Sequence, residues 1–347
     1  MTPTLVFTQG DPAGIGPEIL LRLVDPRRRR SFRPLLVLER SALEAAKGFL
    51  GDLPWQRIHV FERHQLEAAL RVQGEDVAVI DPAGSGRRVT PGQPGAGDAA
   101  GALAALDLGI DLVHGDNAVG DALVTAPLSK AEISNHVTPG FLGHTDYLAE
   151  KAGLSRYGRD YLMGFLAPGL RVALLSTHVP LRRALDLVTE SNVLDALRCL
   201  ARHGGAGGDA GPITVAGLNP HAGEGGLLGT EDDDFVRPAV ETARREGIDA
   251  RGPASADSLF SNVRGGDSGW VLALYHDQGL IAVKTAAFGE ATNWTLGLPY
   301  LRTSVDHGTA YDIAGRGVAR IDSLEAVVAS TLELIRRRTT PPTPDFR

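Results

Sequence analysis

Strand-like and helix-like segments alternate along almost the whole chain, and this alternation limits the possible folds more than any other feature. The apolar run at residues 4–8 precedes a helical pattern at 16–24, and the run at 33–39 precedes another at 41–50. The same order returns in later segments. Alternation of this kind is typical of mostly parallel sheets with helices packed on them. The pattern therefore predicts an α/β architecture.

Length and composition restrict the class of protein. The chain has 347 residues, which suits two domains rather than a single core. Its formal net charge is −7, so it has no basic surface typical of nucleic-acid binding. It begins without a signal-peptide pattern and has no apolar run of membrane-spanning length, so we expect no membrane partner. Its one cysteine, Cys199, excludes an internal disulfide, and we expect a cytoplasmic protein.

Three histidines follow three apolar strand-like runs. His178 ends "VALLSTH", His221 ends "TVAGLNPH" and His276 ends "LALYH". The carboxyl ends of parallel strands lie along one edge of a sheet, and ligands of α/β proteins bind outside that edge. Three imidazoles that leave one position open are typical of catalytic zinc or cobalt sites. Each histidine alone fits an ordinary surface position, but their common placement favours a metal site.

Asp257 and the glycine-rich turn each have a structural and a functional interpretation. Asp257 can cap the helix that its segment predicts, or lie beside the metal as a ligand or an orienting carboxylate. Gly14 and Gly16 suit either a tight strand-to-helix turn or a ligand-binding loop, and their spacing matches neither a P-loop nor the dinucleotide fingerprint.

Several residues indicate an anionic ligand. His144 and Thr145 precede a helical pattern, where Thr145 can cap the helix or free N–H groups can receive a phosphate. Lys284 lies within an apolar run, where an unpaired ammonium is costly. Arg302 offers a planar fork for phosphate or carboxylate, and Asn293 lies between the two. Together these residues predict a pocket for an anionic substrate.

Long motifs in this order resemble one known family, the 4-hydroxythreonine-4-phosphate dehydrogenases of the pyridoxal phosphate pathway. The motifs extend from residue 9 to residue 317, and the GIGPE turn in the first and HGTAYDIAGRG in the last also resemble the isocitrate and isopropylmalate dehydrogenases. They are "GDPAGIGPEI", "GHTDYLAE", "STHVPLR", "GLNPHAGEGG", "PASADSLF", "YHDQGLIAVK" and "TLGLPYLRTSVDHGTAYDIAGRG".

The resemblance implies a two-domain fold like that of isocitrate and isopropylmalate dehydrogenases, with the active site in a cleft between the domains. Residues 1–139 plus 305–347 would form the cofactor side, and 140–304 the α/β domain for metal, substrate and dimerisation. It also implies a homodimer with the active site at the subunit interface, so that His276 can come from the partner.

The resemblance implies a role for each candidate residue, with NAD or NADP as cofactor and one divalent metal (zinc, cobalt or magnesium) per site. Asp257 and Lys284 are the candidates for moving the hydroxyl proton, and the sequence does not choose between them. The predicted metal ligands are His178, His221 and His276; the predicted substrate-binding residues are His144, Thr145, Lys284, Asn293 and Arg302; the predicted cofactor-binding residues are Gly14, Gly16, His307, Gly308 and Asp312.

The implied reaction is a metal-assisted oxidation of 4-phosphohydroxy-L-threonine, a phosphorylated small molecule. Its first product is 2-amino-3-oxo-4-phosphooxybutanoate, which loses CO₂ to give 3-amino-2-oxopropyl phosphate. A related dehydrogenase acting on a four-carbon sugar-acid phosphate or an aromatic dihydrodiol carboxylate is the main alternative. A trihistidine metal hydrolase or lyase without nicotinamide, and a non-catalytic metal- or phosphate-binding protein, are further alternatives.

Overall fold

The computed structural model describes residues 2–28, 30–84, 86–116, 118–205, 210–263 and 269–339. The described residues within Met1–Leu148 and Pro299–Leu332 form one compact unit, and those within Ala149–Leu298 and Glu333–Arg347 form a second. The division predicted from the sequence, at 139/140 and 304/305, stays a prediction, as do the roles expected of its two parts. Residues 340–347 of the predicted cofactor side lie outside the described residues.

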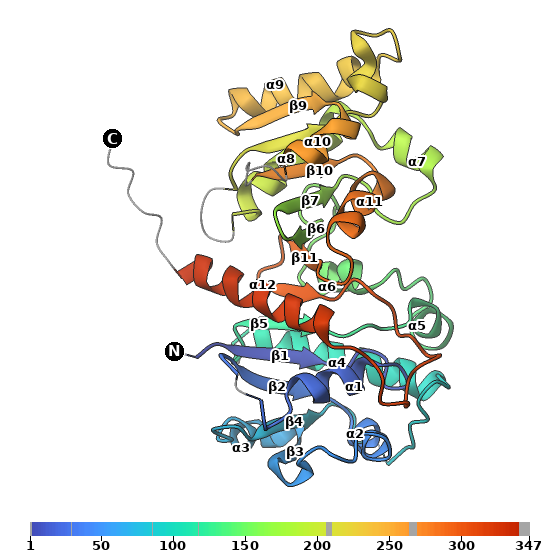
Figure 1. Ribbon diagram of the computed structural model, residues 1–347, viewed down its shortest axis with the longest axis vertical. Helices are drawn as coiled ribbons and strands as arrows, with labels where there is room; N and C mark the ends of the chain where they lie inside the picture. The colour runs from blue at the N-terminus through green and yellow to red at the C-terminus, as the bar shows by residue number, and fades with distance from the viewer. Residues whose placement is uncertain are drawn as a thin grey trace. The chain divides into compact units, whose positions relative to one another are not determined.

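The first unit contains a sheet in which every recorded strand pair is parallel. Its strands lie in the order β3-β4-β2-β1-β5-β12, and Figure 1 shows the blue strands β1 and β2 next to each other. They are β1 (Thr4–Thr8), β2 (Arg33–Val37), β3 (Ile58–Glu62), β4 (Val77–Asp81), β5 (Ala122–Thr125) and β12 (Arg302–Ser304).

Helices connect these strands, and each begins where the sequence supplies a suitable residue. Pro17 stands in the first turn of α1, where its missing N–H costs nothing. The Ser129 hydroxyl accepts a hydrogen bond from the N–H of Glu132 and caps α5. The helices that lie wholly or partly in this unit are α1 (Gly16–Leu23), α2 (Arg40–Lys47), α3 (Leu66–Ala69), α4 (Ala96–Val113), α5 (Lys130–His136), α6 (His144–Lys151) and α12 (Asp322–Thr339), with the short helices η1 (Trp55–Arg57) and η2 (Arg63–Gln65).

The second unit contains a mixed sheet in which parallel pairs carry the candidate site. The order is β11-β6-β7-β10-β8-β9; β6 pairs antiparallel with β11 and β7, and the pairs from β7 to β9 are parallel. Trp270 and Trp294 are almost fully buried in this unit. The strands are β6 (Leu162–Ala167), β7 (Leu170–Leu174), β8 (Ile213–Ala216), β9 (Ala250–Ala254), β10 (Trp270–Ala273) and β11 (Thr292–Leu296).

Helices of the second unit also begin at residues suited to helix starts. The Thr189 hydroxyl accepts from the N–H of Asn192 at the start of α8, whose apolar side includes the buried Cys199. Helix α11 packs on β6, β7 and β10. The helices are α7 (Leu181–Asp186), α8 (Glu190–His203), α9 (Arg237–Arg245), α10 (Ala256–Val263) and α11 (His276–Ala286), with η3 (Pro220–Glu224) and η4 (Asp232–Val236).

These elements confirm the predicted α/β fold with mostly parallel sheets. Among the helices that the structure describes, none is both long and apolar enough to span a bilayer. The cleft expected between two domains stays a prediction.

The turn from β1 to α1 generates a stability prediction. A Cβ atom at Gly16 would lie 1.9 Å from the backbone oxygen of Gln9, which cannot move aside as a flexible side chain could. We expect Gly16→Ala to lower the free energy of unfolding by about 3 kcal/mol or more, measured by urea titration. Gly51→Ala is the control, because nothing lies within 4 Å of its added Cβ. A similar loss in both variants would contradict the predicted clash.

Candidate active site

In the second unit, adjacent parallel strands place the three predicted metal ligands beyond one edge of the sheet. Strand β10 pairs in parallel with β7 on one side and with β8 on the other. His178 follows β7, His221 follows β8, and His276 follows β10 as the first residue of α11. The common edge expected from the sequence is therefore present, although the ligand roles stay predictions.

Two of the three imidazoles are neighbours. The ring centroids of His178 and His276 lie 5.2 Å apart, with the ring planes inclined by 44°. The Nδ1 atom of His276 lies 2.7 Å from an oxygen of Asp277, the next residue along α11. His178 is exposed and His276 is half-buried, so both rings are accessible from solvent.

His221 is held in a strained turn. Its φ of 52° and ψ of 30° fall in the left-handed region, which residues with a Cβ rarely occupy. The fully buried Asp232 supports this turn, because its carboxylate accepts the N–H groups of Leu218 at 2.7 Å and Asn219 at 2.8 Å. The sequence interpretation missed Asp232, and its only signal was the acidic run at 231–234.

Asp257 lies near His221, and its surroundings favour the ionised carboxylate. It occupies the first turn of α10, so it is not the residue that precedes the helix. The Ser255 hydroxyl donates to it at 2.7 Å, and this hydrogen bond, aided by the charge of His221, lowers the pKa of the exposed Asp257 carboxyl. Asp257 also lines a groove of about 870 Å³ together with Tyr275 and Gln278.

The single chain does not bring all three histidines together. Within the ranges that the structure describes, no group of three or more His, Cys, Asp or Glu side chains is placed to hold a metal ion. The second unit instead holds the predicted metal-binding side chains in two pairs. One pair is His178 and His276, and the other is His221 and Asp257.

In the first unit, the predicted substrate residues Arg302 and Thr145 are buried, and His144 is half-buried. Arg302 on β12 is 1% exposed and donates from Nη2 to the Thr125 hydroxyl at 2.7 Å. His144 and Thr145 occupy the first turn of α6, so Thr145 lies inside the helix rather than before it. The Nε2 atom of His144 is buried and makes no hydrogen bond within the described residues.

Burial lowers the pKa values of His144 and Arg302. Burial in the protein interior, together with the positive charges of Arg302 and Lys130, places the pKa of His144 well below its usual 6.5. Burial likewise lowers the pKa of Arg302 to about 10. His144 is therefore neutral at pH 7, and a neutral imidazole can donate one hydrogen bond from one ring nitrogen.

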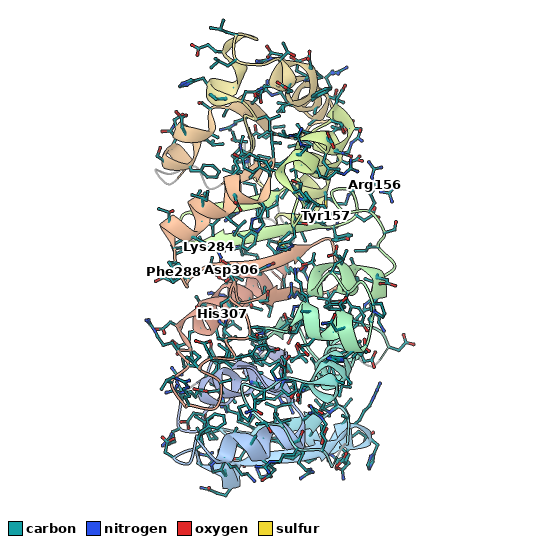
Figure 2. The ribbon with its side chains drawn as sticks, turned by 90° about the vertical axis from the view of Figure 1, so that its right-hand side faces the viewer. Arg156, Tyr157, Lys284, Phe288, Asp306 and His307 are labelled. Carbon is teal, nitrogen blue, oxygen red and sulfur yellow. The ribbon has the colours of Figure 1, made fainter. Side chains whose placement is uncertain are left out.

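The other two predicted substrate residues belong to the second unit. Lys284 lies on α11, where it is exposed rather than enclosed by its apolar neighbours (Figure 2). Asn293 lies on β11, and its buried Oδ1 accepts no hydrogen bond from the described residues. A buried amide oxygen that accepts no hydrogen bond lowers the stability of the fold. This atom is therefore a good candidate for ligand contact.

The predicted cofactor residues lie in two segments of the first unit. Gly14 and Gly16 belong to the turn between β1 and α1, and Gly16 is also explained by its contact with Gln9. The segment after β12 contains the other three predicted residues, which are all exposed, and Figure 2 marks the first of them. They are His307, Gly308 and Asp312.

The chain is similar to known proteins over nearly its full length. Residues 30–330 match the sequence model of a family described as "Pyridoxal phosphate biosynthetic protein PdxA". A 4-hydroxythreonine-4-phosphate dehydrogenase from Chromobacterium violaceum is 42% identical over 330 residues, which cover 94% of this chain and 95% of that protein.

Solved structures agree with this similarity. The 4-hydroxythreonine-4-phosphate dehydrogenase of Klebsiella pneumoniae has a TM-score of 0.81 at 31% identity, covering 96% of this chain and 99% of that one. A terephthalate 1,2-cis-dihydrodiol dehydrogenase from Burkholderia xenovorans has a TM-score of 0.63 at 26% identity, with 95% and 97% covered.

His144, whose Nε2 atom is buried, generates a pH prediction. Its pKa is lower in the folded chain than in the unfolded chain, so the unfolded chain binds the extra proton as pH falls below about 6.5. Stability should therefore fall with acidity from that pH, with a contribution from this residue of up to about 1.4 kcal/mol per pH unit. Urea titrations of His144→Asn should show a flatter slope below pH 6.5.

The exposed His64 supplies the matched control, because His64→Asn also removes one imidazole. A slope that is unchanged in His144→Asn would contradict the assignment of His144 as a neutral buried group.

Proposed function

Because this chain belongs to the PdxA family of pyridoxal phosphate biosynthetic proteins, we propose that it is a 4-hydroxythreonine-4-phosphate dehydrogenase. It oxidises 4-phosphohydroxy-L-threonine with NAD to 2-amino-3-oxo-4-phosphooxybutanoate, which decarboxylates to 3-amino-2-oxopropyl phosphate. The observation that carries this proposal is the full-length similarity to proteins of that name. Arg302, His144 and Thr145 of the first unit also support this proposal, because they suit a phosphate.

Arg302, His144 and Thr145 suit the phosphate of this substrate. A guanidinium offers a fixed planar set of donors, and its burial strengthens each hydrogen bond to an anion. Neutral His144 can donate from Nε2, and Thr145 lies beside it in the first turn of α6, where helix N–H groups favour anions. We assign the remaining polar contacts of the substrate to Lys284 and to the Asn293 amide.

The donor chemistry of the second unit fits a divalent metal. Imidazole nitrogens suit zinc or cobalt, and the Asp257 carboxylate also suits magnesium. Among its described residues, one chain offers the pair His178 and His276, and the His221 turn with Asp257, but no complete set, so we propose that a second copy completes the set with its own His276. Bound there, the metal would supply Lewis-acid stabilisation of negative charge on the substrate oxygen.

Exposed apolar side chains near these loops support a homodimer. Along the chain they follow the segments that carry the histidines, where a partner surface would cover them. They include Leu181, Leu185, Leu227, Ile281 and Phe288.

We divide the proton chemistry between Asp257 and Lys284. A carboxyl group with a lowered pKa is a weak base, so Asp257 suits charge stabilisation and orientation beside His221. Lys284 remains as the group that relays the hydroxyl proton. The cofactor is NAD or NADP, and we assign its binding to the turn with Gly14 and to the segment with His307 and Asp312.

A dehydrogenase acting on an aromatic dihydrodiol carboxylate is the second candidate. The structural similarity to the Burkholderia xenovorans enzyme favours it, and a buried guanidinium also suits a carboxylate. Four-carbon sugar-acid phosphates are a third substrate class, because they carry a phosphate group that the same residues could bind.

The direct test is formation of NADH by the purified protein, followed by absorbance. We expect turnover with 4-phosphohydroxy-L-threonine, loss of turnover with a chelator, and recovery when a divalent metal is added back. Parallel assays use NADP, a four-carbon sugar-acid phosphate and an aromatic dihydrodiol carboxylate. Turnover of the dihydrodiol alone would reassign the substrate, and absence of NAD binding by calorimetry would favour a metal hydrolase or lyase.

The strained His221 supplies a second test. His221→Ala should abolish turnover and lower the bound metal per chain, while circular dichroism stays unchanged. His221→Asn should lose metal in the same way, and asparagine tolerates the left-handed backbone, so this variant separates the lost ligand from added strain. His203→Ala, on α8 of the same unit, should keep both metal and activity. Normal metal content in both His221 variants would contradict the proposed ligand.

A further inference from the structure

Two segments that we assign to cofactor binding are joined by direct contacts in the first unit. The N–H of Ile15, in the turn between β1 and α1, donates to the carbonyl of Thr309 at 2.9 Å. A Cβ at Gly14 would lie 3.0 Å from that same carbonyl oxygen. The turn and the segment after β12 are therefore in close backbone contact, and a side chain at Gly14 would require its neighbours to shift.

A side-chain hydrogen bond reinforces this junction. Tyr311 donates its hydroxyl to Oδ2 of Asp11 at 2.5 Å, while Oδ1 of Asp11 accepts the N–H of Ala13 at 2.9 Å. Asp11 is only 1% exposed. A buried carboxylate is costly unless donors surround it, so the Tyr311 hydroxyl is an important partner for this group.

The backbone on both sides of this bond is constrained. Ala310, directly before Tyr311, has a φ of 45°, in the left-handed region that alanine rarely adopts. Such a conformation persists only when surrounding contacts hold it. A third segment contributes, because the N–H of Gly92 donates to the carbonyl of Ala13 at 2.8 Å and so supports the same turn.

We propose that Tyr311 is a positioning residue for the nicotinamide cofactor. Its bond to Asp11 sets the separation between the turn with Gly14 and the segment with His307, Gly308 and Asp312, without itself touching the cofactor. This inference rests on the proposed function and adds a residue to it. Loss of the hydrogen bond between Tyr311 and Asp11 weakens binding of the cofactor. Binding of the substrate phosphate depends on Arg302, His144 and Thr145, and these residues are unchanged.

Steady-state kinetics of Tyr311→Phe test the proposal. The variant keeps the ring and removes only the hydroxyl, so we expect KM for NAD to rise about tenfold, while kcat and KM for the phosphorylated substrate change by less than about twofold. Calorimetry should show the same weakening of NAD binding. Tyr147→Phe is the matched control: it removes a bond of 2.6 Å from a tyrosine hydroxyl to Asp107 in the same unit and should leave KM for NAD unchanged.

A double-mutant cycle identifies the partner. If Tyr311 acts through Asp11, then Tyr311→Phe should have no further effect on KM for NAD in an Asp11→Ala background, which removes both acceptor oxygens. An unchanged KM for NAD, a lower kcat alone, or equal weakening of both substrates would overturn the proposal while the wild-type protein still forms NADH. A wild-type protein that binds no NAD would instead overturn the proposed function and this inference with it.

Discussion

Parallel strand pairing is the constraint on which both candidate regions depend. In a parallel sheet every strand ends on the same side, so residues that follow different strands meet although they are far apart along the chain. This brings His178 and His276 to a centroid distance of 5.2 Å across the pair β7 and β10. It also brings the first turn of the chain beside the segment that follows β12 in the first unit.

Buried polar groups of the first unit are the second constraint on its structure. Arg302, Asp11 and the Nε2 atom of His144 are removed from water, and each lowers the stability of the folded chain unless partners offset the loss of hydration. Asp11 has its partners within the unit, namely the Ala13 N–H and the Tyr311 hydroxyl. The Nε2 atom of His144 has none among the described residues, and an anionic substrate would supply an acceptor.

In the second unit, one of the predicted metal ligands, His221, lies on strained backbone. The left-handed backbone at His221 is maintained by the buried Asp232, which binds two N–H groups of that turn. Among the described residues, the predicted metal ligands of one chain do not form a single group of three. Under the proposal that a second copy completes it, metal binding, dimerisation and activity become coupled, because each half of the site requires its counterpart.

The sequence by itself determined the α/β fold, the parallel sheets, and the strands after which His178, His221 and His276 stand, because hydrophobic periodicity and turn residues act locally. The long motifs also identified the family. Only the tertiary structure decided which polar side chains are buried: Arg302 is enclosed whereas Lys284 is exposed, although both lie near apolar residues in the sequence. It alone revealed the supports at Asp232 and Tyr311, because burial and hydrogen bonding between distant segments depend on packing, which no local pattern encodes.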